Sequence, residues 1–293
     1  NRAMAMYLSL YGSEEHPAVA TTALLQAHNL YQTGHFESAA TAAEDSANLR
    51  KRQFSPTCAV TAHCSLMRAR LVKDGLRDLE QAKGLLEGCM DCYLNAYGEN
   101  SAFYAEALAE YGDCLRLSCQ FKEAEQTLDR ACVYLAEAYK PLVRASAHKV
   151  THVSMARGMQ YRAQLYMDTD RHAQAACCLE NDLYPALLRL LGKEHPAVHF
   201  IRGLVAKCAK HLAGYSEARP TSALSMINAD SSADVLQEVL QYLDSYDQAR
   251  SPFGEEHPWV LALGGFATDE DRAARNHAID EARDSARSAA RLG

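Results

Sequence analysis

Small and apolar residues recur at helical spacing on both sides of a short turn between Tyr97 and Tyr139. Leu108, Gly112 and Leu115 mark one face of the first predicted helix. Phe121, Ala124, Leu128 and Ala131 mark one face of the second, and Ser118, Cys119 and Gln120 form the turn. Gly112 and Ala124 are expected where the two helices cross, because larger side chains would hold the backbones apart. One such hairpin cannot bury its apolar face alone, so copies must stack against it.

The sequence contains these copies. One hairpin is predicted at 12–53 with a turn at Gly34, and a second runs from Ser55 to about Tyr97 with a slightly lengthened turn at Lys73–Gly75. The third is 97–139, and the fourth runs from Lys140 to about Leu191. Its register is stretched, so we expect a long first helix or an inserted turn. A fifth starts at Gly192, and Pro220 should break its second helix.

The pattern predicts an all-α protein with two regions. Residues 1–219 form a repeat array of about five helix pairs, and 220–293 form an irregular helical extension that caps the array or binds a partner. In the extension we expect an irregular connection to about Asp230, a helix to Arg250 and an Ala/Arg/Asp-rich helix over 268–291. The 15 glycines and 8 prolines in 293 residues are few, which favours helix over sheet.

Charge and hydropathy limit the kinds of partner. A formal net charge of -7 argues against a nucleic-acid-binding surface. No apolar run approaches the roughly 20 residues needed to span a bilayer. The N-terminal apolar stretch is too short for a secretory signal, and the chain does not begin with methionine, which leaves open a fragment or a processed form.

Most of the ten cysteines occupy positions where the repeat favours a small apolar residue. Buried free cysteine behaves as a small hydrophobe, so we expect thiols in a reducing, cytoplasmic compartment. Cys89 and Cys92 form a single Cys-x-x-Cys pair, and His63 and Cys64 are the nearest residues that could complete a metal site. One such pair is a weak signal for zinc, so thiols in or near the core are preferred to a metal site.

A Gly-x-x-His-Pro signature recurs at 192–196 and 254–258, and at 12–17 with one extra residue. With the small-residue-rich helix that follows, it resembles the tetratricopeptide repeats (TPRs) of kinesin light chains. The resemblance covers 11–219 well and 220–293 poorly. It implies a right-handed superhelical solenoid of helix hairpins whose inner groove holds peptide segments. Where that family carries paired asparagines that contact cargo, this chain has Leu24-Leu25 and Ala109-Glu110, and the coiled coil that binds a motor is absent.

The inner groove would be lined by first-helix residues that point away from the hairpin core. We expect it to bind an extended or helical segment of a partner protein, with its Arg and Lys residues pairing with the partner's carboxylates. The alternative, that these are ordinary solvated helix faces, stays open. By spacing, the groove residues are His28, Tyr31, Gln32, His63, Arg70, Lys73, Glu106, Asp113, Arg116, Arg157, Gln160, Gln164, Lys207, Lys210 and His211.

These features predict a non-catalytic interaction scaffold or adaptor that is a subunit of a hetero-oligomeric assembly. The resemblance favours a cytoskeletal, motor or ciliary complex. No cofactor is expected, because nucleophile elbows, phosphate-binding glycine loops and zinc-protease motifs are absent from the sequence. His16, His195 and His257 belong to the repeat signature. Two alternatives stay open. One is the repeat-bearing tail of a larger enzyme, such as a SET-domain methyltransferase. The other is a mainly structural subunit whose convex surface is also covered.

Overall fold

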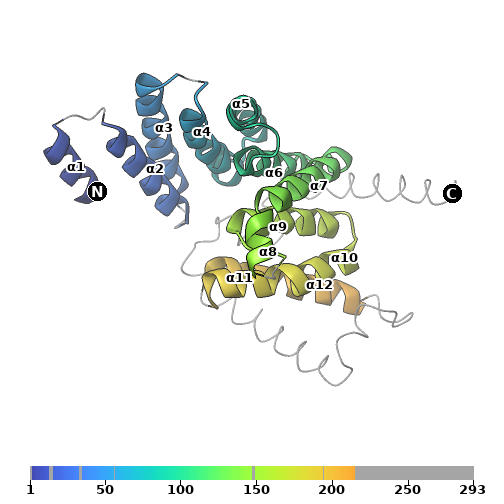
Figure 1. The fold of residues 1–293 in the computed structure, drawn as a ribbon. Helices are drawn as coiled ribbons and strands as arrows, with labels where there is room; N and C mark the ends of the chain where they lie inside the picture. Colours follow the sequence, from blue (N-terminus) through green and yellow to red (C-terminus); the bar gives the residue numbers. More distant parts are fainter. Residues whose placement is uncertain are drawn as a thin grey trace. The chain divides into compact units, whose positions relative to one another are not determined.

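The structure, a computed structural model, describes residues 2–12, 16–32, 35–55, 57–146, 149–193 and 195–214. Within these ranges the chain forms helices and turns and no strand, as the sequence predicts (Figure 1). Internal contacts divide the chain into two units, Asn1–Ser118 and Cys119–Gly293, and each is described by itself. Gly34, the second half of the fifth hairpin and the predicted 220–293 extension lie outside the described residues.

The first unit is a row of helices in which each packs against the next along the chain. Contacts join α2 to α3, α3 to α4, α4 to α5 and α5 to α6, the nearest-neighbour pattern of a repeat array (Figure 1). The elements are α1 (Arg2–Tyr11), α2 (Pro17–Gln32), α3 (Phe36–Gln53), α4 (Ala59–Leu71), the wide π-helical turn η1 (Val72–Leu76), α5 (Leu79–Tyr97) and α6 (Ala102–Leu117).

Small residues fill the contact between α2 and α3, as predicted. Ala27 of α2 and Ala39 and Ala43 of α3 are fully buried, and they pack with Met67 and Leu71 from the next helix. Because alanine has no side chain beyond Cβ, the helix backbones can approach closely here. The first hairpin is thus joined to the second by a shared core.

The second hairpin has the core that its spacing predicts. Ala62, Leu66 and Ala69 of α4 pack in one buried cluster with α5, where Leu86 and Cys89 lie on the facing side. Cys89 stands where another repeat would have alanine, and it is 1% exposed. The cluster extends to α6 through buried residues of that helix, so the second hairpin and the first helix of the third share one core.

The lengthened turn of the second hairpin is a wide helical turn. Helix α4 continues as η1, and Arg77 then adopts a left-handed conformation with φ of 60°. Asp78 starts α5 and accepts a hydrogen bond from the Gln81 backbone N–H at 2.9 Å. Gly75 lies in this turn against Phe36 of α3. A Cβ on Gly75 would lie 2.6 Å from Phe36 Cγ, so only glycine fits without a shift of the neighbouring hairpin.

The second unit repeats the hairpin pattern with two interruptions. It consists of α7 (Phe121–Ala138), α8 (Lys140–Ser146), α9 (Val153–Asp168), α10 (His172–Cys177), the π-helical turn η2 (Cys178–Leu183), α11 (Tyr184–Leu191) and α12 (Pro196–Gly214). Contacts join α7 to α9, α9 to α10, and α12 to both α10 and α11. The turn predicted at Ser118–Gln120 is confirmed by the bounds of α6 and α7.

The fourth hairpin corrects one prediction. Its first helix, α9, has 16 residues, the same length as α6, so it is not long. The extra residues instead form the short separate helix α8. The second helix of the hairpin is interrupted by η2 just before Pro185, which lacks a backbone N–H and cannot continue a regular helical ladder.

The recurring histidine of the sequence signature caps the start of a helix. His16 Nδ1 accepts a hydrogen bond from the Ala18 N–H at 3.2 Å, and His195 Nδ1 accepts from the Ala197 N–H at 3.1 Å. The glycine of the signature at Gly192 has a positive φ of 82°, a conformation that glycine adopts at little cost. The signature is therefore explained by local backbone geometry and does not require a role in catalysis.

A further copy of this cap was missed because proline is replaced by valine. His152 precedes Val153 and its Nδ1 accepts from the Ser154 N–H at 3.2 Å. Its ring stacks on Tyr139 with the ring centroids 4.3 Å apart, as His16 stacks on Tyr11 at 3.7 Å. In both cases a tyrosine near the end of an earlier helix stacks on the histidine that caps a later helix.

The Gly75 contact predicts a measurable cost of substitution. Gly75→Ala should lower the free energy of unfolding by about 1–3 kcal/mol, because the new Cβ overlaps the fixed stem of Phe36. The control is Gly84→Ala in α5, where nothing lies within 4 Å, and it should gain about 0.5–1 kcal/mol from helix propensity. Urea unfolding followed by circular dichroism measures both. Equal stability of the two variants would contradict this placement of η1.

Candidate functional site

The predicted groove residues differ widely in exposure. Two are exposed, namely His28 and His63. Six are half-buried, namely Tyr31, Arg70, Glu106, Arg157, Gln160 and Lys207. Four are buried, namely Lys73, Asp113, Arg116 and Gln164. Gln32, Lys210 and His211 belong to described helices, but their side chains lie outside the described part of the chain.

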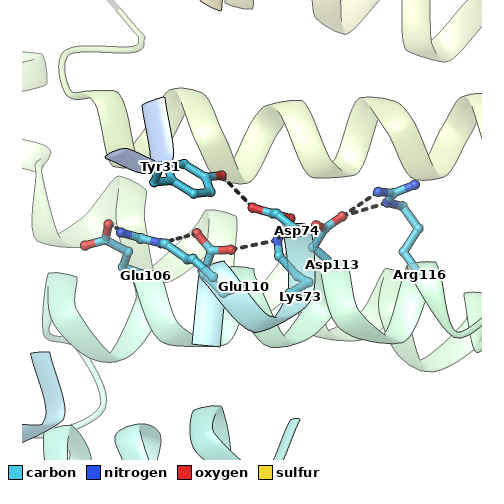
Figure 2. Close-up of polar contacts among 8 residues, drawn as sticks. Tyr31, Lys73, Asp74, Glu106, Glu110, Asp113 and Arg116 are labelled. Carbon is cyan, nitrogen blue, oxygen red and sulfur yellow. Dashed lines mark hydrogen bonds and ion pairs between the residues drawn. The ribbon is translucent and has the colours of Figure 1, made fainter. Parts of the chain in front are cut away.

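Six of these residues meet in one polar cluster in the first unit. Figure 2 shows how the labelled side chains point toward one another from α2, η1 and α6. We call this cluster the first-helix network, because it joins the first helices of three successive hairpins, and its members are Tyr31, Arg70, Lys73, Asp74, Glu106, Glu110, Asp113 and Arg116.

Arg70 connects α4 to α6 through two carboxylates. Its Nε donates to Glu110 Oε1 at 2.7 Å, and its Nη2 donates to Glu106 Oε1 at 2.6 Å. Glu106 and Glu110 are one helical turn apart, so they lie on the same face of α6 and present their oxygens to one guanidinium. Charge-assisted hydrogen bonds of this length are among the strongest polar contacts in proteins.

Lys73 lies at the centre of the network and is only 1% exposed. Its ammonium donates to Asp113 Oδ2 at 2.6 Å and to Glu110 Oε2 at 2.9 Å, and Asp74 Oδ1 lies 3.4 Å away. Asp113 also accepts from Arg116 Nε at 2.8 Å. A buried ammonium needs such compensation, because removing a charge from water costs several kcal/mol.

Tyr31 extends the network to α2, as Figure 2 shows. Its hydroxyl donates to Asp74 Oδ2 at 2.5 Å, and these residues come from different hairpins. Burial raises the pKa of Asp74; Lys73 lowers it, and the nearby carboxylates Glu110 and Asp113 raise it again. The wide turn η1 thus holds a carboxyl group whose neutral form is favoured by its surroundings.

The network balances its own charge almost completely. Three cationic side chains face four carboxyl groups, a formal sum of 3 − 4 = −1 when all are ionised. The arginines and lysine that were expected to pair with a partner's carboxylates therefore pair with the chain's own. Lys73 and Arg116 in particular are buried, which does not agree with their expected position on a groove surface.

Sequence reasoning missed two members of the network, Asp74 and Glu110. Glu110 is 1% exposed and is bound to Arg70 and Lys73. A signal was present in the spacing, because acidic residues recur on one face of α6 while basic residues follow one another on α4 and η1. Their opposite charges predict pairing only if the helices are known to be neighbours.

The predicted groove residues of the second unit lie on α9 and α12. Arg157, Gln160 and Gln164 follow one face of α9, and Gln164 is 8% exposed. Its Oε1 accepts no hydrogen bond from a described residue. That these side chains and Lys207 contact a partner stays a prediction.

Half of the ten thiols are buried, as expected of small apolar residues, whereas Cys177 is exposed. Cys89 Sγ donates to the Ala62 carbonyl at 3.3 Å, and burial raises the pKa of Cys89 to about 12. Burial also raises the pKa of Cys64, which lies 3.3 Å from the Ser46 hydroxyl. Such thiols stay protonated at neutral pH and are poor nucleophiles and metal ligands. Among the described residues, no group of three or more His, Cys, Asp or Glu side chains could hold a metal ion.

The described helices are not membrane spans. None of them combines the length and apolar character that a membrane span requires.

The central position of Lys73 predicts a large effect on stability. Lys73→Met should lower the free energy of unfolding by about 3–5 kcal/mol, because Glu110 and Asp113 would keep buried charges without their shared partner. The matched control is Lys140→Met, which breaks an exposed pair with Glu137 and should change stability by less than about 1 kcal/mol. Thermal and urea unfolding measure both variants. A loss for Lys73→Met no larger than for Lys140→Met would contradict the arrangement of the network.

The raised pKa of Asp74 predicts a pH-dependent effect. The folded state binds the proton of the Asp74 carboxyl group more tightly than the unfolded state does. Ionisation of Asp74 therefore lowers stability as pH rises above the ordinary aspartate pKa of about 4. Asp74→Asn removes this term and can still accept from Tyr31. The stability of the variant relative to wild type should therefore improve as pH rises from about 4 to about 8. Urea titrations at a series of pH values measure this difference, and a difference that falls with pH would contradict the shift.

Comparisons with known proteins bear on the fold. No protein-family model matches the chain. No curated protein matches it either. Two solved structures, described as nearly identical TPR-like repeats of a putative kinesin light chain from Podosopora anserina, are similar to it.

Both likenesses extend over most of the chain at low sequence identity. A single-residue variant of that protein is 15% identical with a TM-score of 0.51, and the match covers 80% of this chain and 98% of the other. The second structure is 14% identical with a TM-score of 0.50, and the match covers 80% and 99%. At such identities the likeness is one of fold. The described part of the chain is therefore an all-α array of TPR-like helical hairpins, in agreement with the sequence signature and the helix packing.

Proposed function

We propose that this protein is a non-catalytic interaction scaffold that holds segments of partner proteins on the first helices of its hairpins. The observation that supports this most directly is the first-helix network, which joins α2, α4 and α6 while leaving other residues of the same helices exposed. His28 of α2, His63 of α4 and Phe103 of α6 are exposed. A surface whose helices are already fixed loses little conformational freedom when a segment binds.

The kind of assembly is proposed by analogy. The similar structures are of a kinesin light chain, which favours a subunit of a cytoskeletal, motor or ciliary complex in the cytoplasm. The net charge of -7 and the paired cations of the network favour protein segments over nucleic acid as the bound partner. Non-catalytic action is part of the same proposal.

Site-specific photocrosslinking tests which helix face contacts partners. The full chain would carry benzoylphenylalanine in place of His28 or His63 and be irradiated in cell extract. The matched controls replace Asp45 of α3 or Gln81 of α5, which are exposed on second helices. We expect reproducible adducts, identified by mass spectrometry, from the first-helix positions and few from the controls. Adducts only from the second-helix positions, or none at any position, would contradict the proposal.

A further inference from the structure

Two half-buried cysteines belong to the facing helices of the second hairpin. Cys58 is the N-cap residue of α4, and Cys92 lies in the last part of α5. Both are free thiols, and both are partly exposed, so a small molecule in solution can reach them.

The register of the hairpin places these two thiols at the same level. Helices α4 and α5 are the two arms of one hairpin and run antiparallel. The Cys89 thiol donates to the Ala62 carbonyl at 3.3 Å, which aligns these two positions. Cys58 lies one turn before Ala62, whose N–H donates to the Cys58 carbonyl at 3.0 Å, and Cys92 lies three residues after Cys89. Because the helices are antiparallel, one turn back on α4 corresponds to one turn forward on α5, so Cys58 faces Cys92.

The contact between α4 and α5 is close enough for a bond between side chains. Ala62 and Ala69 of α4 and Ala82 of α5 are buried in the shared core and have no side chain beyond Cβ. At the level of Ala62, the single thiol of Cys89 spans the distance to the backbone of α4. Cys92 packs against the same core cluster. A disulfide needs Cα atoms within about 7 Å of each other, a separation that small residues at a helix contact allow.

The Cys58 thiol also acts on Cys92 electrostatically. Burial raises the pKa of Cys92, and Asp91 and the Cys58 thiol raise it further. A negative charge on one sulfur opposes a charge on the other, as expected of two neighbouring thiols. The raised pKa lowers the thiolate fraction of Cys92 at neutral pH, so we assign Cys92 to the second step of a thiol–disulfide exchange.

We propose that Cys58 and Cys92 are a redox-sensitive thiol pair that closes to a disulfide and cross-links the second hairpin. A low-molecular-weight disulfide such as oxidised glutathione is the oxidant. The Cys58 thiolate attacks one of its sulfurs, the S–S bond breaks, and one glutathione thiolate leaves and takes up the proton that Cys58 released. The Cys92 thiolate then attacks the Cys58 sulfur of the mixed disulfide, and the second glutathione leaves in the same way. Two protein thiols are oxidised, and one small disulfide is reduced to two thiols.

The bond would regulate the stability of the second hairpin. It joins the start of α4 to the last part of α5 and closes the long loop that contains η1. Such a cross-link restricts the unfolded chain and thereby favours the folded hairpin. Because η1 carries Lys73 and Asp74, the cross-link also secures the helices that hold the first-helix network. The pair stays open where small thiols keep the surroundings reducing, and it closes when the fraction of small disulfide rises.

Peptide mapping of the full chain tests the proposal. The reduced, folded protein is incubated at neutral pH with oxidised glutathione, its remaining thiols are alkylated, and it is digested with trypsin without reduction. We expect mass spectrometry to show peptides 53–68 and 84–116 linked to each other and separated again by a reductant.

Variants assign the bond, because each of these peptides contains further cysteines. Cys58→Ser and Cys92→Ser should each abolish the link, and serine is a preferred N-cap residue, so the first variant keeps the start of α4. The control is Cys177→Ser, which removes an exposed thiol of the second unit and should leave the link unchanged. Oxidised wild type should melt about 5 °C or more above reduced wild type, and neither Cys58→Ser nor Cys92→Ser should show this gain.

Several results would overturn the proposal. Wild type that takes up glutathione at Cys177 but forms no linked peptides would show that the pair does not close. A link that persists in Cys58→Ser or Cys92→Ser would assign the bond to other cysteines of the same peptides. An unchanged or lower melting temperature of the linked protein would show that the bond does not fit the folded hairpin. Photocrosslinking at His28 uses neither cysteine, so its outcome is independent of this test.

Discussion

Seven ionisable groups and one tyrosine hydroxyl meet where the first helices of three hairpins are joined. Because several of them are buried, their charges and hydrogen-bonding atoms must be compensated by one another. Lys73 is the strictest case, because its ammonium is almost fully buried and is surrounded by oxygens of three carboxyl groups. Apolar contacts hold each hairpin to the next, but they are not directional. The ion pairs are directional, so they set which residue of α4 faces which residue of α6. We infer that this network fixes the register between hairpins in the first unit.

The backbone of η1 places two members of this network. The wide turn η1 continues α4 and carries both Lys73 and Asp74. Gly75 lets this turn lie against Phe36 of the preceding hairpin. The cations of the network are paired with carboxylates of the same chain. The exposed side chains of the first helices therefore include imidazole and aromatic rings, such as those of His28, His63 and Phe103.

Much of this architecture could be predicted from the sequence. The recurrence of Ala27, Ala39 and Ala43 identified a helix crossing, because only small residues allow close backbones. The histidine signature located helix starts at His16 and His195. What could not be predicted is which charged faces meet. Periodicity places Lys73 and Arg116 on a face away from the hairpin core, but it does not show that acidic residues of a neighbouring helix cover that face. Likewise, the stretched register of the fourth hairpin could not distinguish a long helix from the separate helix α8.

A double-mutant cycle between Lys73 and Glu110 tests this account most directly. Urea unfolding would be measured for Lys73→Met, Glu110→Gln, the double variant and wild type. If the two groups are a buried pair within one network, the double variant should lose less stability than the sum of the single losses, by about 1 kcal/mol or more. Losses that add within about 0.5 kcal/mol would contradict it, because independent sites behave in that way.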